Sequence, residues 1–481
     1  MKQHSVLYNF IMNVILTMSS FIFPLITFPY VSRILLPEGN GKVSFAASVV
    51  NYFLLIAQLG IPMYGIRACA KVRDDKEKLN KTVQEILAIS VVMCIISYML
   101  FTVVLFCVPR LWQEKELMII TSASILFTTL GAEWIFKALE MYSYITWRSI
   151  VFKCIALGAM FLLVHEQEDY IIYGAISIYA SSASNILNFL YLHRLVTLKK
   201  RYRLELHSHM KPIFVFFAMS CATTVYLNMD TIMLGFMKTD ADVGYYNAAV
   251  KIKNMLVSMV TSLGAVLLPR VTAYIEQNEQ EKFQDLSVKA LRFVLFAAIP
   301  MLVYFIIFAE PSMLALSGKE YANAVLPMQI MMPTLLFIGL TNIMGIQIMV
   351  PMNKENKVLA SVIAGAAVDL VLNILLIPKY SVSGAAAGTM TAELVVFIYQ
   401  YFSERKIMHG LFCKINPCKT VISTAISSGI TVWILSLNMN SFSMLILSCV
   451  CFFGTYLISL MMLHDEFVLE LFQMLRDKLR I

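Results

Sequence analysis

The chain has 481 residues, of which 59% are hydrophobic and only 14% are charged. This composition, with apolar runs along the whole length, excludes a soluble globular protein and indicates a polytopic membrane protein. The formal net charge of +8 fits a basic membrane face beside anionic lipid and does not call for nucleic acid as a partner.

The apolar runs predict an all-α fold with about fourteen membrane-spanning helices, each close to the length of about 20 residues that crosses a bilayer. The first run begins near Tyr8 and continues to about Leu36 without a small-residue cleavage site. We therefore expect a retained span and not a signal peptide. The predicted spans are 8–32, 43–66, 84–108, 117–136, 147–164, 170–192, 212–236, 243–268, 290–309, 324–350, 358–377, 384–402, 420–437 and 442–463.

The lysines and arginines predict the orientation. Placing the N-terminus in the cytoplasm puts most of the 38 basic residues in cytoplasmic segments, in line with the positive-inside rule. The densest clusters, 67–81 and 193–211, then lie inside, and so do both termini. The sequence thus predicts a multi-pass protein of the bacterial cytoplasmic (inner) membrane.

Loop lengths and motifs favour transport over catalysis. A membrane-bound polymerase or glycosyltransferase would be expected to carry a large external loop or a soluble catalytic part, and this chain has room for neither. The nine cysteines show no metal-binding spacing, and no GxxxxGK[ST] nucleotide-binding loop is present. The sequence therefore predicts a protein that is not an enzyme and uses no cofactor or metal.

The C-terminal tail, "HDEFVLELFQMLRDKLRI" (464–481), is amphipathic. Its apolar residues share one helical face, with the charges elsewhere, as in helices that lie on a membrane surface. We expect this tail on the inner surface. The apolar face consists of Val468, Leu471, Phe472, Leu475 and Leu479.

An internal repeat organises the chain. "GKVSFAASV" (41–49) resembles "GYYNAAVKI" (244–252), so that Gly41 aligns with Gly244 and Ala46 with Ala249. An even number of spans in each half would relate the copies by an axis along the membrane normal. The predicted parts are a six-helix bundle at 1–206, a second at 207–410, and two further helices with the tail at 411–481.

Three segments resemble one protein family. They are "FPLITFPYVSRILLPEGNGKVSFA" (23–46), "LGIPMYGIRACAKVRDD" (59–75) and "YLNMDTIMLGFMKTDADVGYYNAAVKI" (226–252). They are similar to the bacterial polysaccharide-repeat flippases of the Wzx or O-antigen type, within the multidrug/oligosaccharidyl-lipid/polysaccharide exporter superfamily. The resemblance implies two six-helix bundles in a V-shaped arrangement around a central cavity. It also implies movement of undecaprenyl-diphosphate-linked oligosaccharide from the inner to the outer leaflet.

Further expectations follow from that resemblance. The glycan would serve O-antigen, capsule or exopolysaccharide assembly in lipopolysaccharide or related pathways, and its movement would be coupled to an ion gradient. A polysaccharide polymerase and a chain-length regulator would be partners beside the lipid-linked glycan and the membrane lipids. The identity of the sugars does not follow from the resemblance.

In spans 1, 2, 7 and 8, polar residues recur at steps of three and four and so form a polar line along one face of each helix. Small polar residues also join neighbouring helices without lining a cavity, but helix packing does not require the lysine in span 8. The lines include Asn9, Asn13, Thr17 and Ser20; Ser44, Ser48, Asn51 and Gln58; Ser220, Thr224, Asn228 and Thr231; and Asn247, Lys251, Asn254, Ser258 and Thr261.

Basic residues at membrane depth are candidates for binding the diphosphate. A lysine inside a spanning helix costs about 2.5 to 3.5 kcal/mol and usually marks a water-filled cavity or an ion pair. Lys251 and Lys253 lie about 200° apart on one helix, so we expect one of them to pair with an acid such as Asp230 or Asp369. The predicted substrate-binding residues are Lys251, Arg33, Arg67, Lys153, Lys253, Asn247 and Asn254, with snorkelling to the interface as the alternative for the two arginines.

Four acids also lie within predicted spans: Glu133, Asp230, Asp369 and Glu393. Because desolvation favours the neutral form of a carboxyl group, each is a candidate proton carrier, and each is equally a candidate static partner for a buried lysine. Two other functions stay open. One is a multidrug or metabolite cation antiporter of the same fold, and the other is a non-transporting scaffold for glycan assembly.

Overall fold

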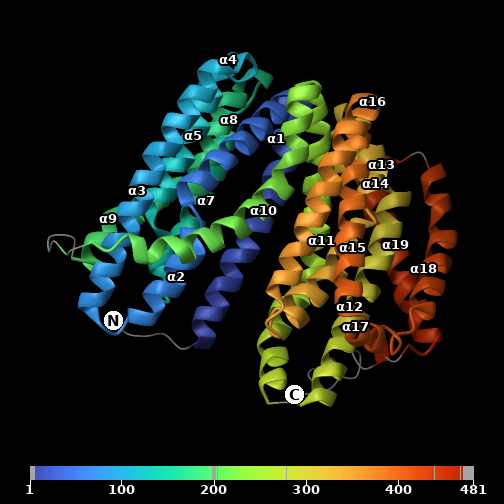
Figure 1. Cartoon of the computed structure of the whole chain (residues 1–481). Helices are drawn as coiled ribbons and strands as arrows, with labels where there is room; N and C mark the ends of the chain where they lie inside the picture. The colour runs from blue at the N-terminus through green and yellow to red at the C-terminus, as the bar shows by residue number, and fades with distance from the viewer. Residues whose placement is uncertain are drawn as a thin grey trace. The chain divides into compact units, whose positions relative to one another are not determined.

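The computed structural model describes residues 6–197, 202, 204–277, 279–437, 439–465 and 467–469. These residues form helices joined by short turns and contain no β-strand (Figure 1). The predicted all-α class is confirmed. The chain divides into two compact units, Met1–Gly244 and Tyr245–Ile481, and the predicted boundaries at 206 and 410 stay a prediction.

Unit 1 is built around α1, which packs against α3, α5, α7 and α10. Its α8 and α9 are separated by a short π-helical segment, 179–183. The helices of this unit are α1 (Val6–Gln58), α2 (Ile61–Val72), α3 (Lys76–Cys107), α4 (Pro109–Gln113), α5 (Lys115–Gly131), α6 (Glu133–Ala138), α7 (Tyr142–Leu163), α8 (Tyr170–Ile178), α9 (Asn185–Leu195) and α10 (His207–Met237), with a 3-10 turn at Gln167–Asp169.

Predicted span 1 and most of predicted span 2 form one long helix with a sharp break. Leu36 leaves the helical conformation at φ 57° and ψ 179°. Because it precedes Pro37, the α region is sterically disfavoured for Leu36. A single residue therefore redirects α1 where the sequence analysis expected a loop between two helices.

Two glycines at the repeat positions bring α1 and the start of α11 (Asp240–Glu276) into backbone contact. A β-carbon on Gly41 would overlap the carbonyl oxygen of Asp240, and one on Gly244 would overlap that of Pro37. Each glycine thus faces the residue one helical turn before the other glycine. Both contacts lie within unit 1, and the internal repeat stays a prediction.

One end of unit 1, called here the Lys42 end, carries a polar network. The ammonium of Lys42 lies 3.0 Å from the Glu114 carboxylate, whose other oxygen accepts a 2.9 Å hydrogen bond from Tyr170. Arg110 forms an ion pair with Asp240. These contacts join four turns that the sequence analysis assigns to the outer side.

The opposite end, called the Arg73 end, joins turns assigned to the inner side. Arg73 pairs with Glu140 at 2.6 Å, and Lys81 pairs with Glu205 at 2.8 Å. Next to them, the buried ring of His209 contacts Glu85 at 2.8 Å and the Tyr64 hydroxyl at 2.6 Å. The start of α10 is therefore anchored on α2 and α3.

Unit 2 continues along α11 and contains a second long kinked helix. In α16, Ser381 adopts φ 46° and ψ −123°, which joins predicted spans 11 and 12 through one non-helical residue. The remaining helices are α12 (Gln280–Ile307), α13 (Ala309–Ser317), α14 (Val325–Met331), α15 (Thr334–Thr341), α16 (Glu355–Ser403), α17 (Arg405–Phe412), α18 (Cys418–Thr431) and α19 (Ser441–Met462), with 3-10 segments at Lys319–Ala324 and Val432–Ser436 and a π-helical segment at Asn342–Met349.

The last two spans pack on α12. The Tyr304 hydroxyl lies 2.9 Å from Ser448 on α19, and Tyr456 donates a 2.9 Å hydrogen bond to the carbonyl oxygen of Phe296. Val468 is buried against Tyr456, so the tail begins by packing on the protein. The rest of its predicted apolar face, Leu471, Phe472, Leu475 and Leu479, lies outside the described residues.

Nine helices among the described residues are long and apolar enough to cross a membrane, or ten if one bent pair counts as a span. The chain is therefore a multi-pass membrane protein. The predicted spans fall on helical segments, but α16 contains two of them, α1 contains the first and most of the second, and predicted spans 4, 6 and 10 are each divided between shorter helices. The number fourteen itself is not confirmed.

Candidate functional site

Lys153 lies near the middle of α7, facing α1. Its ammonium donates hydrogen bonds to the hydroxyls of Ser19 and Ser20, at 3.0 and 2.9 Å. Both serines donate their own hydrogens to the carbonyl oxygen of Leu16, so their lone pairs are available to the lysine. An ammonium has three donors, and two are used here. Within the described parts of the chain, no carboxylate forms an ion pair with Lys153.

Glu133, a predicted proton carrier, is instead surrounded by cations. One carboxylate oxygen lies 2.9 Å from Lys137 and the other 2.9 Å from Arg148. Arg148 also donates to the Ser184 carbonyl oxygen and to the Asn185 side chain. The sequence analysis missed Arg148 and Lys137, because residues near the ends of predicted spans are normally assigned to the interface.

Asp369 and Asn373 lie on the first half of α16 and face its second half. Both are buried, and a β-carbon on Gly388 would lie 2.8 Å from the Asp369 carboxylate and 2.7 Å from the Asn373 amide oxygen. The absence of a side chain at Gly388 therefore gives these polar groups their space. Asp369 and Asn373, one helical turn apart, therefore share a face of α16.

Thr389, the residue after Gly388 on α16, contacts α11. Its hydroxyl lies 3.0 Å from that of Tyr246. Glu393, one turn further along α16, is also buried. Unit 2 thus places buried polar groups where the two halves of α16 face each other, and one of these groups, Thr389, contacts α11.

The two lysines of α11 differ in burial. Lys253 is buried and shares a face with Tyr246, seven residues earlier, whereas Lys251 is half-buried. This agrees with their predicted separation around the helix. On the same helix, Asn247 is half-buried and Asn254 is exposed.

The remaining predicted residues lie in unit 1. Arg33 is exposed and donates a 2.6 Å hydrogen bond to the carbonyl oxygen of Pro29. Arg67 is exposed on α2, and Asp230 is buried on α10. The predicted polar lines of spans 2 and 7 meet where the amide of Asn51 donates to that of Asn228 at 3.2 Å.

A resident metal has no visible site in the part of the chain that the structure describes, since no group of three or more His, Cys, Asp or Glu side chains is arranged to hold one. The chemistry available in the described part is that of cations, carboxylates, hydroxyls and amides within membrane-spanning helices. Such groups suit reversible binding of a polar, anionic molecule.

Comparison with known proteins gives one family. Residues 6–275, more than half of the chain, match the family model described as polysaccharide biosynthesis protein. An Escherichia coli (strain K12) protein named "Putative O-antigen transporter" is 25% identical over 383 residues, which cover 79% of this chain and 91% of that protein.

Solved structures show the same fold. The lipid II flippase MurJ in its inward closed conformation has a TM-score of 0.74 at 17% identity, covering 95% of this chain and 100% of that one. An inward-facing multidrug resistance MATE family transporter of the MOP superfamily has a TM-score of 0.62 at 13% identity, covering 82% of this chain and 96% of that one. At these identities the likeness concerns the fold.

Proposed function

The chain belongs to the polysaccharide biosynthesis protein family, and from that membership we propose that it is a flippase for lipid-linked oligosaccharide. The resemblance to the O-antigen flippases of the exporter superfamily, predicted from the sequence, is confirmed by the family match and the relatives. The proposed cargo is an undecaprenyl-diphosphate-linked repeat unit, carried from the cytoplasmic to the outer leaflet of the inner membrane with both termini inside.

The environment of Lys153 is the observation that supports an anionic cargo. A charged ammonium in the middle of a spanning helix is costly unless it is paired or serves a polar molecule. Here two serine hydroxyls bind it without neutralising its charge. A diphosphate would supply the missing negative charge, and lysine binds phosphate as a point charge that also releases it readily.

Other cations complete the proposed path. Lys251, Lys253, Arg33 and Arg67, with Asn247 and Asn254, are proposed to contact the headgroup at successive depths. A cation antiporter of the same fold would favour unpaired acids over unpaired bases along its path, so Lys153 supports the glycan-lipid function over that alternative.

Coupling to an ion gradient is proposed to involve the buried acids Asp369, Glu393 and Asp230. Each can change its charge if a proton or cation reaches it. Glu133 fits a static role better, because two cations already balance it. The sugar sequence, the polymerase and the chain-length regulator stay open.

The test is complementation of surface glycan in a strain that lacks its flippase, with lipid-linked repeats assayed in the inner leaflet and protein level checked by blot. We expect wild-type protein to restore the glycan, Lys153→Arg to restore part of it, and Lys153→Ala and Lys153→Glu to lose most of it. The glutamate variant should be worst, because it repels the phosphates in a low-dielectric environment.

Lys319→Ala serves as the matched control, since Lys319 is an exposed lysine outside the predicted spans. It should behave as wild type. If wild-type protein neither restores glycan nor clears the accumulated lipid-linked repeats, the flippase proposal is wrong. If Lys153→Ala is fully active but Lys251→Ala is not, the anion site belongs to α11.

A further inference from the structure

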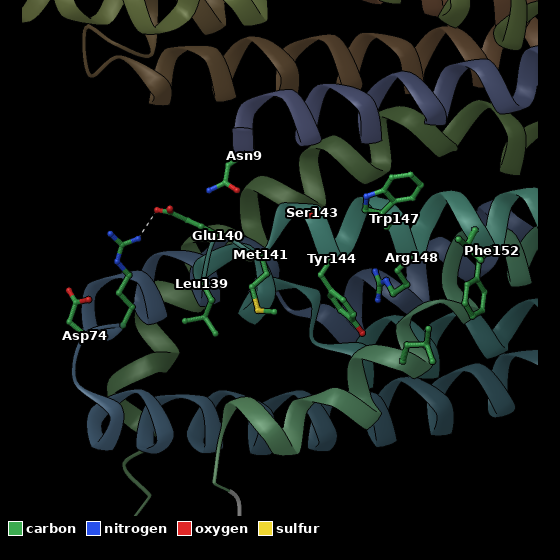
Figure 2. A pocket seen from close by; sticks show the side chains of 13 residues that line it. Asn9, Asp74, Leu139, Glu140, Met141, Ser143, Tyr144, Trp147, Arg148 and Phe152 are labelled. Carbon is green, nitrogen blue, oxygen red and sulfur yellow. Dashed lines mark hydrogen bonds and ion pairs between the residues drawn. The ribbon is translucent and has the colours of Figure 1, made fainter. Parts of the chain in front are cut away.

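A cavity within unit 1 has a volume of about 860 Å³. It opens at the Arg73 end, between the start of α1, the end of α2, the turn from α6 to α7, and one face of α7 (Figure 2). This volume lies within the range of about 300 to 1,000 Å³ typical of small-molecule sites. Neither Lys153 nor any predicted binding residue lines it.

Aromatic rings form one wall. Tyr144, Trp147, Arg148 and Val151 recur at steps of three and four along α7 and so share a helical face. Trp147 is 61% exposed. Tyr144 belongs to a cluster of three rings: Phe136 and Tyr191 each stack on it with centroids 5.3 Å away, and these two rings contact each other at 6.3 Å.

Two buried polar side chains line the cavity with unsatisfied atoms. Asn9 is 7% exposed and Arg148 is 6% exposed. The Asn9 amide oxygen and the Arg148 Nε have no hydrogen-bond partner among the described residues. Asn9 projects from α1 into the space beside Glu140 (Figure 2). Buried polar atoms without partners are costly, so a small side-chain shift that presents them to a polar ligand would be favourable.

The rim is polar and strained. Glu140 adopts φ 56°, a conformation that costs a non-glycine residue about 1 to 3 kcal/mol and that clusters at functional sites. Its carboxylate is held by Arg73 at 2.6 Å, and Asp74 lies beside them. The turn between α6 and α7 is therefore fixed in place at the mouth of the cavity.

The charges on the lining residues cancel. Arg73 and Arg148 contribute two positive charges, and Asp74 and Glu140 contribute two negative charges, which gives a net charge of zero. A diphosphate requires an excess of positive charge. A neutral ligand with many hydroxyls requires no excess charge. Its hydroxyls can accept hydrogen bonds from the arginines and donate hydrogen bonds to the carboxylates.

We propose that this cavity binds a neutral sugar residue of the glycan, with the pyranose ring stacked on Trp147. The C–H bonds on one face of a pyranose are weakly positive and contact the negative face of an indole ring, while Asn9, Arg148 and the Arg73–Glu140 pair reach its hydroxyls. The assignment rests on the proposed flippase function for its substrate class. Lys153 lies six residues further along α7, about 9 Å of helix rise, so sugar and phosphate would be bound at separate places on one helix.

The experiment measures binding by calorimetry to the purified full chain in detergent. The probe is the oligosaccharide released by mild acid from the lipid-linked repeat of the source strain, and inorganic diphosphate is the second ligand. Trp147→Ala should weaken saccharide binding about tenfold, the effect of losing one aromatic contact, while Trp147→Phe should retain most of it. Asn9→Ala should also weaken it. Diphosphate binding should respond to Lys153→Ala and not to Trp147→Ala.

Trp112→Ala is the matched control, because Trp112 is an exposed tryptophan of the same unit that lies outside the cavity. It should bind saccharide as wild type does. Absence of saturable saccharide binding, unchanged affinity in Trp147→Ala, or competition by diphosphate at this cavity would overturn the inference. Wild-type complementation is scored separately, so a working flippase whose Trp147→Ala variant binds saccharide normally refutes only the sugar site.

Discussion

Two cations on α7, Arg148 and Lys153, show how neighbours decide the role of a residue. Arg148 is buried with a carboxylate, an amide and a backbone oxygen around it, whereas Lys153 is bound only by hydroxyls. The sequence identified Lys153 and Glu133 as embedded charges. It could not show that Glu133 is already neutralised, because that pairing depends on how α6 folds back on α7.

This difference predicts that Glu133 contributes to stability and that Lys153 does not. Glu133→Gln should lower the free energy of unfolding by about 1 to 3 kcal/mol, because it leaves the buried Arg148 charge without its carboxylate. Adding Arg148→Gln to that variant should recover part of the loss. Lys153→Ala should unfold at the wild-type temperature. The measurement is thermal unfolding of the purified protein in detergent.

The opposite pattern would change the role assigned to Glu133. If Glu133→Gln unfolds at the wild-type temperature but transport no longer responds to a pH gradient, Glu133 is a proton carrier. Transport assays of Asp369→Asn and Glu393→Gln in the same series would show whether the buried acids of α16 carry that response instead.

At the scale of elements, the hydrophobic runs predicted segments that are helical in the structure. They did not predict how these segments are joined or where they are interrupted. A run reports that a segment is apolar over enough residues to cross the membrane. The break at Leu36 follows from Pro37 and was readable in principle. The π-helical segments at 179–183 and 342–349 were not, because they depend on how an extra residue is accommodated in tertiary packing.

The reciprocal glycine contact between α1 and α11 gives the element-scale prediction. Gly41→Ala and Gly244→Ala should each destabilise the protein, since the added carbon would overlap backbone oxygens that have no room to move. Gly158→Ala on α7, where the added carbon would meet nothing within 4 Å, should be neutral or slightly stabilising because alanine is the better helix former.

Unfolding temperature and protein level in the membrane would check these variants. If the repeat contact is symmetric, Gly41→Ala and Gly244→Ala should lose similar amounts of stability, and the double variant should lose less than the sum because both changes separate the same two helices. If both single variants are as stable as the wild type, the contact between these two glycines does not stabilise the fold.

For the whole molecule, the sidedness of the turns in unit 1 agrees with alternating spans. The Lys42 end joins turns that the positive-inside argument puts outside, and the Arg73 end joins turns that it puts inside. The sequence predicted this grouping because loop order alone determines it once the spans are located. Loop order does not show which end faces the cytoplasm, and that orientation rests on the distribution of lysine and arginine.

Cysteine labelling tests the orientation, and the structure selects the reporters. Cys69 is buried and would resist any reagent from either side, whereas Cys413 and Cys418 are exposed. In intact cells, a variant that retains only these two cysteines should resist a membrane-impermeant thiol reagent and should label after permeabilisation.

A cysteine-free variant carrying Glu168→Cys, an exposed position beside the Lys42 end, should label in intact cells. The reverse pattern would show that the protein has the opposite orientation in the membrane. Labelling of both variants in intact cells would contradict the alternation of spans between them, since Glu168 and Cys413 must lie on opposite sides if each intervening span crosses the bilayer once.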